Sequence, residues 1–379
     1  MTDTLDLWHL LTSPRFTGAA EPALTLCRDL AARGHRVVFF ADRKREGDLL
    51  RRAVEDFGVR CGDGPTLSAK ASPLEMVHDL RWLARRFRGP DGPDLVHCHH
   101  TNDHLLCRLA ARGSEGPLIV RHLHGGGAVA PGWTRRWLWR GTAGAVTADP
   151  GMEAEVRRRH GMAAERVLLL SDTVDARRFT PDGPGRVEVR RRLGLTEDTP
   201  LLGLVARFRP GRGHDRLVRV FRHVRQLVPG AHLALVGRGE ERAAVEALVR
   251  LLELERAVHF PGYFADDLPE LYRSLDAAVL LREGSDAGCR GVLEAMASGL
   301  PVVGTDRAAM PRLIADGETG YIVEDGDEQA LARVLARLLG DRSRCRSMGR
   351  AARTRVERRF GPEARAERCE RFYLQLLAR

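Results

Sequence analysis

Lysine is almost absent from this chain. Among its 61 basic residues only Lys44 and Lys70 are lysines, so arginine carries nearly all of the positive charge. The formal net charge is +10, which is compatible with an anionic ligand, an anionic membrane surface or a plain solvated basic surface. Arginine keeps its charge in any environment and binds phosphate in a bidentate manner, so the composition permits phosphate recognition without identifying it.

Features of several protein classes are also missing. The seven cysteines are scattered and form no Cys-x-x-Cys pair, so neither a disulfide framework nor a zinc site is indicated. No run approaches the roughly 18 apolar residues that span a bilayer, and the acidic N-terminus lacks a signal-peptide layout. No recognised nucleic-acid-binding motif occurs, so we expect no nucleic-acid partner. These absences predict a soluble cytoplasmic protein.

Strand-like and helix-like segments alternate along most of the 379 residues. This order predicts parallel sheets with helices on both faces, in two Rossmann-like α/β domains that face a cleft where ligands bind. A stretch rich in proline, glycine and charge, residues 177–200, interrupts the alternation and suits an inter-domain connector. The expected strands are residues 5–11, 36–40, 94–98, 118–121, 144–147 and 166–170, then 201–206, 232–236, 257–260, 277–281, 301–304 and 321–323.

Residues 283–303 form the most informative stretch. Asp286 stands eight residues before Glu294, Gly288 and Gly291 lie between them, and a short apolar helix follows. Such a loop exposes helix N-terminal N–H groups, which together with the helix dipole favour an anion. A carboxylate one or two turns into the helix accepts hydrogen bonds from hydroxyl groups of the same ligand. A ligand with both phosphate and hydroxyl groups is a nucleotide or a sugar nucleotide.

Two arginines open the second half of the chain. Arg207 directly follows an expected buried strand, and Arg212 precedes Gly213 and an expected helix. The pair is able to clamp a pyrophosphate, although two solvated loop arginines explain the same pattern. Gly237 and Gly239 resemble a dinucleotide-binding loop but lack its third glycine, so a tight turn that lines a nucleotide base is the better interpretation.

Histidines end a strand of the first half. Alternation places His97 and His99 on one face of that strand. No carboxylate or cysteine completes a recognised ligand spacing, so we predict no metal site. His99, at the strand tip, is interpreted as a hydrogen-bond donor in the cleft, and His97 as a core residue. Gly18 lies in a loop of small residues that lets a ligand approach backbone N–H groups or simply makes a tight connection.

Two segments mix aromatic residues with arginine. Trp133, Trp137 and Trp139 alternate with arginines, and Trp82 precedes another basic run. Aromatic anchors beside arginines suit the headgroup region of an anionic membrane. Packing of the tryptophans within the first domain is the interpretation we favour, so peripheral contact with the cytoplasmic face of an inner membrane stays an open alternative.

Taken together, these motifs resemble one family. The chain is similar to the retaining, nucleotide-sugar-dependent glycosyltransferases of the large family four (group 1), which have the two-domain GT-B fold. The resemblance covers nearly the whole chain and is strongest over residues 201–339. The segments that carry it are residues 207–213, 235–239, 260–263, 268–276 and 286–303, supported by residues 17–37, 94–99 and 174–181.

The resemblance implies the domain organisation. It implies an acceptor-binding domain at 1–178, a linker at 179–199, a nucleotide-sugar-binding domain at 200–358, and a C-terminal helix at 359–379 that packs back on the first domain. It also implies transfer of a hexose from a UDP- or GDP-linked donor to a hydroxyl of a glycan or lipid-linked acceptor in bacterial envelope synthesis. Neither a metal nor a cofactor is required, because arginines supply the positive charge.

Individual roles follow from the same resemblance. Glu294 would bind the ribose, Asp286 the donor-sugar hydroxyls, and His99 the donor sugar from the opposite domain. Arg207 and Arg212 would stabilise the departing diphosphate. The expected catalytic residues are therefore His99, Arg207, Arg212 and Asp286, and the expected donor-binding residues are Gly18, Gly237, Gly239, Ala287, Gly288, Cys289, Arg290 and Glu294.

The chain departs from the family pattern at the first acid. The family usually has a glutamate where Asp286 stands, and Glu283 lies just upstream at the wrong spacing. This departure leaves a non-catalytic sugar-nucleotide binder open as an alternative, and a sugar-nucleotide epimerase shares the fold. A scaffold that docks on membranes through its basic surface is the third alternative. The phosphorylases of this fold need a cofactor-binding lysine, and neither lysine lies in the second domain.

Overall fold

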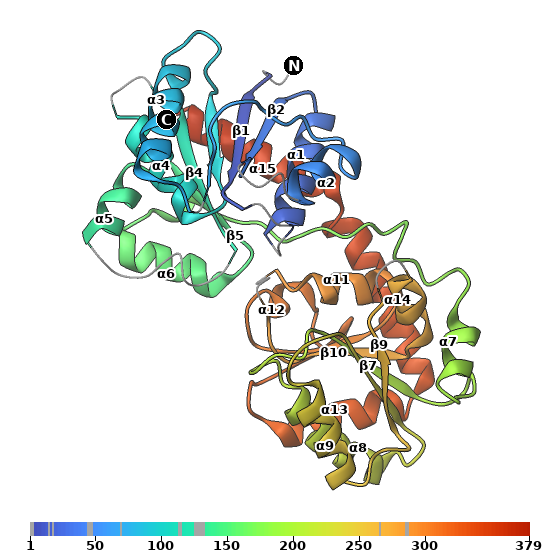
Figure 1. Cartoon of the computed structure of the whole chain (residues 1–379). Coiled ribbons are helices and arrows are strands. Elements are labelled where there is room, and N and C mark those ends of the chain that lie inside the picture. The colour runs from blue at the N-terminus through green and yellow to red at the C-terminus, as the bar shows by residue number, and fades with distance from the viewer. Residues whose placement is uncertain are drawn as a thin grey trace. The chain divides into compact units, whose positions relative to one another are not determined.

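The computed structural model describes residues 4–13, 16, 19–43, 48–68, 70–112, 116–124, 133–264, 267–284 and 288–379. The chain divides into two compact units (Figure 1). The first unit holds the residues up to 172 together with Pro362–Arg379, and the second holds Thr173–Gly284 and Gly288–Gly361.

A six-stranded parallel sheet, in the order β2-β1-β3-β4-β5-β6, forms the centre of the first unit. Its central strands are almost entirely buried, as expected of a parallel sheet that is covered on both faces. The strands are β1 (Asp6–Leu11), β2 (Arg36–Ala41), β3 (Leu95–Cys98), β4 (Leu118–Leu123), β5 (Gly144–Thr147) and β6 (Val167–Leu169). The helices are α1 (Ala20–Ala32), α2 (Asp48–Glu55), α3 (Pro73–Phe87), α4 (Thr101–Ala110), α5 (Trp133–Arg140), α6 (Pro150–His160) and α15 (Pro362–Leu377), with a 3₁₀ turn at Ala164–Arg166.

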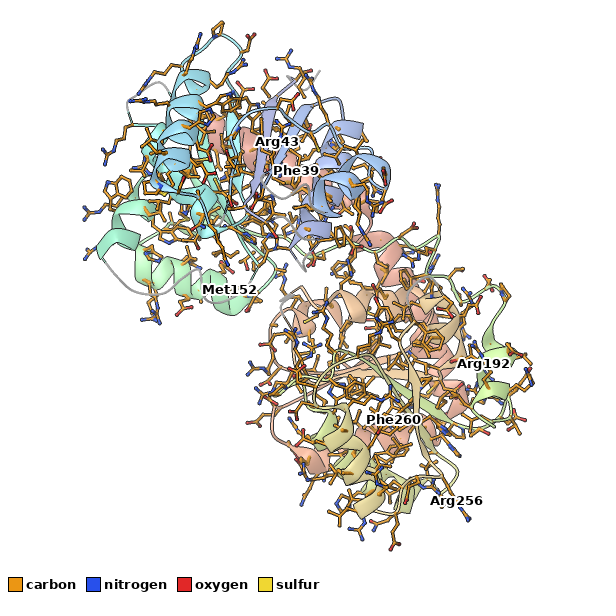
Figure 2. The ribbon with its side chains drawn as sticks, viewed as in Figure 1. Phe39, Arg43, Met152, Arg192, Arg256 and Phe260 are labelled. Atoms are coloured by element: carbon orange, nitrogen blue, oxygen red, sulfur yellow. The ribbon has the colours of Figure 1, made fainter. Side chains whose placement is uncertain are left out.

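Alternate side chains of β1 point to opposite faces of this sheet. Leu7 and Leu11 belong to a core with α1 and α15, whereas Trp8 and Leu10 belong to a core with α3 and α4. Phe39 of β2, labelled in Figure 2, is fully buried in the first of these cores. His9 lies between Leu7 and Leu11 in the strand, so its side chain enters the face that α1 and α15 cover.

The C-terminal helix α15 is fixed to α1 by buried ion pairs. Arg365 donates to Asp29 at 2.9 Å, and both side chains are almost fully buried. Glu370 accepts from Arg33 at 2.6 Å and contacts His35 at 3.1 Å. These contacts join two helices that stand more than 300 residues apart in the sequence.

A second six-stranded parallel sheet, in the order β12-β11-β10-β7-β8-β9, forms the centre of the second unit. The structure thus confirms the predicted pair of α/β sheets, and each expected strand is present with ends that shift by a few residues. The strands are β7 (Leu201–Val205), β8 (His232–Val236), β9 (Val258–Gly262), β10 (Ala277–Leu280), β11 (Val302–Thr305) and β12 (Gly320–Val323). The helices are α7 (Arg186–Arg192), α8 (His214–Leu227), α9 (Arg242–Leu251), α10 (Leu268–Ser274), α11 (Arg290–Ala297), α12 (Met310–Leu313), α13 (Glu328–Leu339) and α14 (Arg342–Arg359).

The stretch that we expected to be a plain connector contains helix α7 and packs on the second unit. Arg190 is fully buried, donates to Asp276 at 2.7 Å, and also donates to the carbonyl oxygens of Ser274 and Thr196, both at 2.8 Å. Arg192 of the same helix projects from the surface (Figure 2). The guanidinium of Arg190, together with that of Arg186, which donates to Asp276 at 3.0 Å, thus fixes a segment whose composition suits a connector.

The aromatic–basic segments pack largely inside the first unit. Trp139 is buried against His160, with ring centroids 4.9 Å apart, and Trp82 packs on Trp8 at 5.7 Å. Trp137 lies beneath the guanidinium of Arg108 at 5.1 Å. These contacts agree with the packing interpretation for Trp82, Trp137 and Trp139.

A bilayer-crossing helix needs about 20 predominantly apolar residues. No helix in the described part of the chain meets that requirement.

The Asp29–Arg365 pair gives a direct test of how α15 is held. Asp29→Ala leaves the Arg365 charge buried without its partner, and we expect the free energy of unfolding to fall by about 3–5 kcal/mol. The matched control is Glu367→Ala on the same helix, because Glu367 pairs with Arg371 at 3.8 Å on the exposed side. That change should cost less than about 1 kcal/mol in denaturant unfolding. Equal losses in the two variants would contradict a buried anchor.

Candidate active site

The strand order of the second sheet reverses between β7 and β10. The chain proceeds from β7 outward through β8 and β9, then returns to β10 on the other side of β7 and continues through β11 and β12. In open parallel sheets the loops after the two strands at such a reversal diverge, and the crevice at their carboxyl ends binds ligands. Here those loops are residues 206–213 and 281–289, whose sequence contains half of the predicted site residues.

Contacts between glycines and side chains bring these two loops together. A side-chain carbon on Gly284 would lie 2.5 Å from a guanidinium nitrogen of Arg212, so the arginine packs directly against this glycine. A carbon on Gly291, in the first turn of α11, would lie 4.0 Å from the carbonyl oxygen of Val205 at the end of β7. Arg212 and the start of α11 therefore both lie beside the end of β7.

Arg207 and Arg212 occupy different environments. Arg207 is exposed, and its guanidinium makes no ion pair with any residue that the structure describes. Arg212 is half-buried against the loop after β10. Phe208 between them is buried, and its backbone N–H donates to Arg238 at 2.9 Å, which fixes the loop that presents Arg207. The arrangement leaves one arginine available to solvent and packs the other.

Gly237 and Gly239 allow two loops to meet at the edge of the sheet. Both have a positive φ, near 150°, and a side-chain carbon on either would lie 2.1 Å from a carbonyl oxygen, that of Ala206 or Phe208. The glycines therefore let the loop after β8 pack directly on the loop after β7. This close packing is a structural reason for both glycines, and the prediction that they line a nucleotide base stays a prediction.

Glu294 is buried in α11 and held by a tyrosine. The hydroxyl of Tyr272 donates to its carboxylate at 3.1 Å, and Arg290 lies 3.3 Å from the other oxygen. Burial, together with the nearby Glu294, raises the pKa of Tyr272 well above its usual value, so the hydroxyl stays protonated and donates. Phe179 packs edge-on against the tyrosine ring, with centroids 5.9 Å apart. Tyr272 was not predicted from the sequence, although it lies in a segment that carries the family resemblance.

The remaining residues of the loop before α11 are only partly described. Gly288 is buried, and Cys289, also buried, has a left-handed backbone (φ 54°) and begins the helix that Arg290 continues. A non-glycine residue in this conformation is uncommon and costs about 1 kcal/mol or more, so the surrounding structure must hold it. Three predicted residues, Asp286, Ala287 and Gly18, lie outside the described residues.

Glu283, the alternative first acid, belongs to an ion-pair network. Arg307 contacts it with two hydrogen bonds, at 2.8 and 3.1 Å, and Arg307 also lies 3.5 Å from Asp325. Burial alone would raise the pKa of Glu283, but the hydrogen bonds from Arg307, a backbone hydrogen bond and the charges of Arg307 and Arg282 together outweigh it and lower that pKa. Its carboxylate thus already has a partner inside the second unit.

In the first unit, the strand order reverses between β1 and β3, and His99 lies at this reversal. Asp103 joins the two loops there, because its carboxylate accepts from the backbone N–H groups of Thr12 at 2.8 Å and His100 at 2.7 Å. Burial raises the pKa of Asp103, whereas the neighbouring positive groups and these hydrogen bonds oppose that shift.

Both ring nitrogens of His99 lie close to other histidines. One ring nitrogen lies 3.1 Å from His9 and the other lies 3.0 Å from His124, so both nitrogens are in hydrogen bonds. A hydrogen bond from His99 to a sugar would require one of these to open. His122 lies within β4, which extends to Leu123 rather than ending at Arg121 as expected. It therefore belongs to the buried sheet.

Comparison with known proteins identifies the family. Residues 186–355 match the family described as glycosyl transferases group 1, and residues 16–178 match glycosyltransferase family 4. A GDP-mannose-dependent alpha-(1-6)-phosphatidylinositol monomannoside mannosyltransferase of Mycobacterium tuberculosis is 31% identical over 348 residues, which are 86% of each protein. The N-acetyl-alpha-D-glucosaminyl L-malate synthase of Bacillus anthracis is 28% identical over 96% of this chain and 95% of that protein.

Solved structures show the same fold. A glycosyltransferase from Rickettsia africae matches with a TM-score of 0.82 at 16% identity and covers 99% of both chains. Alr3699/HepE of Anabaena, solved in complex with UDP, matches with a TM-score of 0.79 at 18% identity and covers 98% of this chain and 100% of that one. The fold is therefore the two-domain GT-B fold. The chain belongs to the group 1 (family 4) glycosyltransferases.

His214, at the start of α8, makes the second unit sensitive to acid. Burial, and then the charge of Arg212, lower its pKa from 6.5 to about 4. The unfolded chain therefore binds this proton below pH 6.5 and the folded chain only below about 4, so stability is lost as the pH falls through that window. We expect about 2–3 kcal/mol of loss from this residue between pH 7 and pH 4.5.

The measurement is denaturant unfolding of the second-unit transition at the two pH values. His214→Asn should reduce the loss between them, because the amide does not titrate. His223→Asn, an exposed position on the same helix, is the matched control and should leave the loss unchanged. An unchanged pH dependence in His214→Asn would contradict the assignment.

Proposed function

We propose that this glycosyltransferase transfers a hexose, with retention, from a UDP- or GDP-linked donor to a hydroxyl of a glycan or lipid-linked acceptor in bacterial envelope synthesis. The observation that carries the proposal is the convergence at the β7/β10 reversal, where the Arg207–Gly213 loop meets the helix that holds Glu294. Relatives named as GDP-mannose-dependent mannosyltransferases, and a structural neighbour that binds UDP, support a nucleotide-linked donor.

The chemistry assigned to the residues follows from charge. The bond between the anomeric carbon and the diphosphate oxygen breaks, the acceptor oxygen forms the new bond, and the acceptor proton passes to the departing diphosphate. Negative charge grows on the diphosphate during this step, and a positive group placed beforehand stabilises the transition state more than the ground state. Arg207, exposed at the end of β7, is the group we assign to this role, with Arg212 beside it.

Glu294 is assigned to the ribose hydroxyls. Its carboxylate is a hydrogen-bond acceptor only, and Tyr272 fixes its orientation from the buried side. A carboxylate accepts hydrogen bonds from the hydroxyl groups of a diol, whereas it would repel phosphate. Asp286 is assigned to the donor sugar, because Glu283 is bound by Arg307.

We further propose that transfer requires no metal or cofactor. Contact with an anionic membrane face is part of the same proposal.

Arg207→Ala should lower kcat by about 100-fold or more with a smaller effect on KM, because it removes charge stabilisation of the leaving group. The matched control is Arg209→Ala, which removes an exposed arginine two residues away in the same loop. Steady-state transfer from the preferred donor measures both. Equal activity of the Arg207→Ala variant and the wild type would rule out the proposed leaving-group role.

Donor binding is tested separately by calorimetry with UDP, GDP and ADP and their sugars. Glu294→Gln should weaken binding of the preferred nucleotide by about tenfold, because one charge-assisted hydrogen bond contributes about 1.5 kcal/mol or more. Tyr272→Phe should weaken it by less, since the carboxylate remains.

Nuclear magnetic resonance of the product tests retention, and an α-linked donor sugar that yields a β-linked product would contradict it.

A further inference from the structure

Five histidines gather on one face of the first sheet, outside the nucleotide site proposed for the second unit. His9 of β1 pairs in register with His97 of β3, and the register of β3 with β4 places His122 level with His99. His124 follows two residues later. Because side chains alternate along a strand, all five rings project to the same side, the one covered by α1 and α15.

Burial disfavours the charged form of these rings. Burial lowers the pKa of His9 and of His124 to about 3, and lowers the pKa values of His97, His99 and His122 well below 6.5. Each neutral imidazole has one nitrogen lone pair, so at neutral pH the cluster offers donor atoms without charge repulsion between them.

Three nitrogens of this cluster lack a partner. Nε2 of His9, Nε2 of His97 and Nδ1 of His122 are buried and make no hydrogen bond with any described residue. A buried polar atom left in this state costs about 1–3 kcal/mol, which is unusual for a folded protein. The three atoms lie on the neighbouring strands β1, β3 and β4, and a ligand held between β3 and β4 would satisfy two of them.

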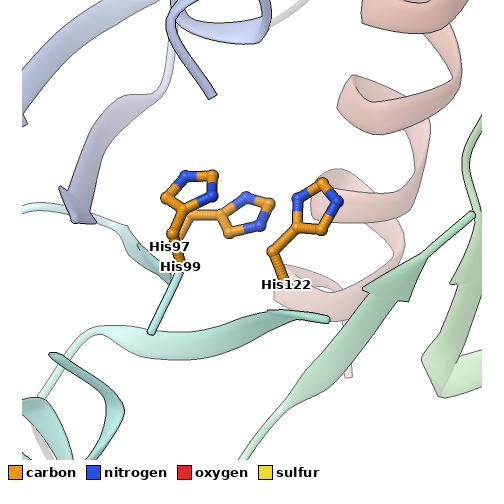
Figure 3. Close-up of side chains that lie close together, drawn as sticks. All are labelled: His97, His99 and His122. Carbon is orange, nitrogen blue, oxygen red and sulfur yellow. The ribbon is translucent and has the colours of Figure 1, made fainter. Parts of the chain in front are cut away.

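We propose that His97, His99 and His122 form a binding site for a divalent transition metal of the zinc type, with one ring nitrogen from each. These nitrogens lie within 4.8 Å of one another, and the three rings lie side by side (Figure 3). Imidazole nitrogens suit zinc, copper, nickel and cobalt. The spacing in the sequence did not predict this site, because the third ligand comes from the next strand.

Metal binding requires the rings to turn. Zinc–nitrogen bonds of about 2.1 Å in tetrahedral geometry place the ligand atoms about 3.4 Å apart, closer than the widest separation here. The terminal torsion of histidine is broad, so such rotation is inexpensive. His99 would release one of its hydrogen bonds, to His9 or His124, and keep the other.

Neighbouring side chains provide hydrogen-bond partners for the ring nitrogens that would not bind the metal. The hydroxyl of Tyr373, on α15, contacts Nδ1 of His97 and leaves Nε2 for the metal. His124 or His9 supports His99 in the same way. Partners of this kind fix the tautomer and orientation of each ligand. Three protein ligands leave a fourth position open for water or an anion.

Nearby positive charge is compensated. Arg365, which faces the cluster, is paired with Asp29 at 2.9 Å, and Arg121 interacts with the buried Asp103. A divalent ion held by the three rings would therefore meet no large uncompensated positive charge.

The experiment uses the full-length chain without a histidine tag. Titration with Co²⁺, followed by visible absorption, should show one tetrahedral ion per chain, and Zn²⁺ should displace it. His122→Gln should weaken binding by more than about 100-fold, since losing a ligand costs at least as much as losing its outer-shell support. The matched control is His259→Gln, which removes half of the close His232–His259 pair (2.9 Å) in the second unit and should change nothing.

X-ray absorption of the Zn²⁺-loaded wild type provides a measurement that does not depend on a variant. Three imidazole ligands are expected, and fewer would overturn the proposal, as would the absence of any Co²⁺ band at neutral pH. Equal weakening by His259→Gln and His122→Gln would also overturn it. None of these readouts involves sugar transfer, so the metal site and the proposed function can fail independently.

Discussion

The reversal of strand order in each parallel sheet is the constraint on which the candidate site depends. Parallel strands end at the same edge, and the loops that leave two adjacent strands in opposite directions open a crevice there. In the second unit this edge is completed by close backbone contacts that glycine alone allows, at Gly237 and Gly239, and by the packing of Arg212 against Gly284. The backbone thus brings Arg207, Arg212 and Glu294 to one edge although almost 90 residues separate the first from the last.

Burial decides the state of the polar groups at both sheet edges. In the second unit it keeps the Tyr272 hydroxyl protonated, so that a tyrosine can orient a carboxylate that must bind hydroxyl groups. In the first unit it keeps the clustered histidines neutral, so that they hydrogen-bond to one another and offer lone pairs. The same desolvation therefore favours an oriented hydrogen-bond acceptor in one unit and imidazole rings with available lone pairs in the other.

Arginine serves two distinct purposes in this lysine-poor chain. Arg190 and Arg365 are buried and satisfied by carboxylates and carbonyl groups, and they attach α7 and α15 to their units. Arg207 is exposed and unpaired within the described residues, which suits an anionic ligand. The planar guanidinium makes both uses possible, because it can make several hydrogen bonds at once and keeps its charge when buried. Composition alone cannot separate the two uses.

The sequence by itself determined the alternation of elements, the positions of the strands, and the segments that carry the family resemblance, because continuous apolar runs and loop glycines are local signals. It did not reveal helix α7, because a segment rich in arginine gives no sign that one of its arginines, Arg190, is buried. It also missed the support of Glu294 by Tyr272, the engagement of Glu283 by Arg307, and the approach of His122 to His97 and His99. Only the tertiary structure decided these, because parallel neighbours and their side-chain partners lie some twenty or more residues apart, and register, not spacing along the chain, sets which atoms meet.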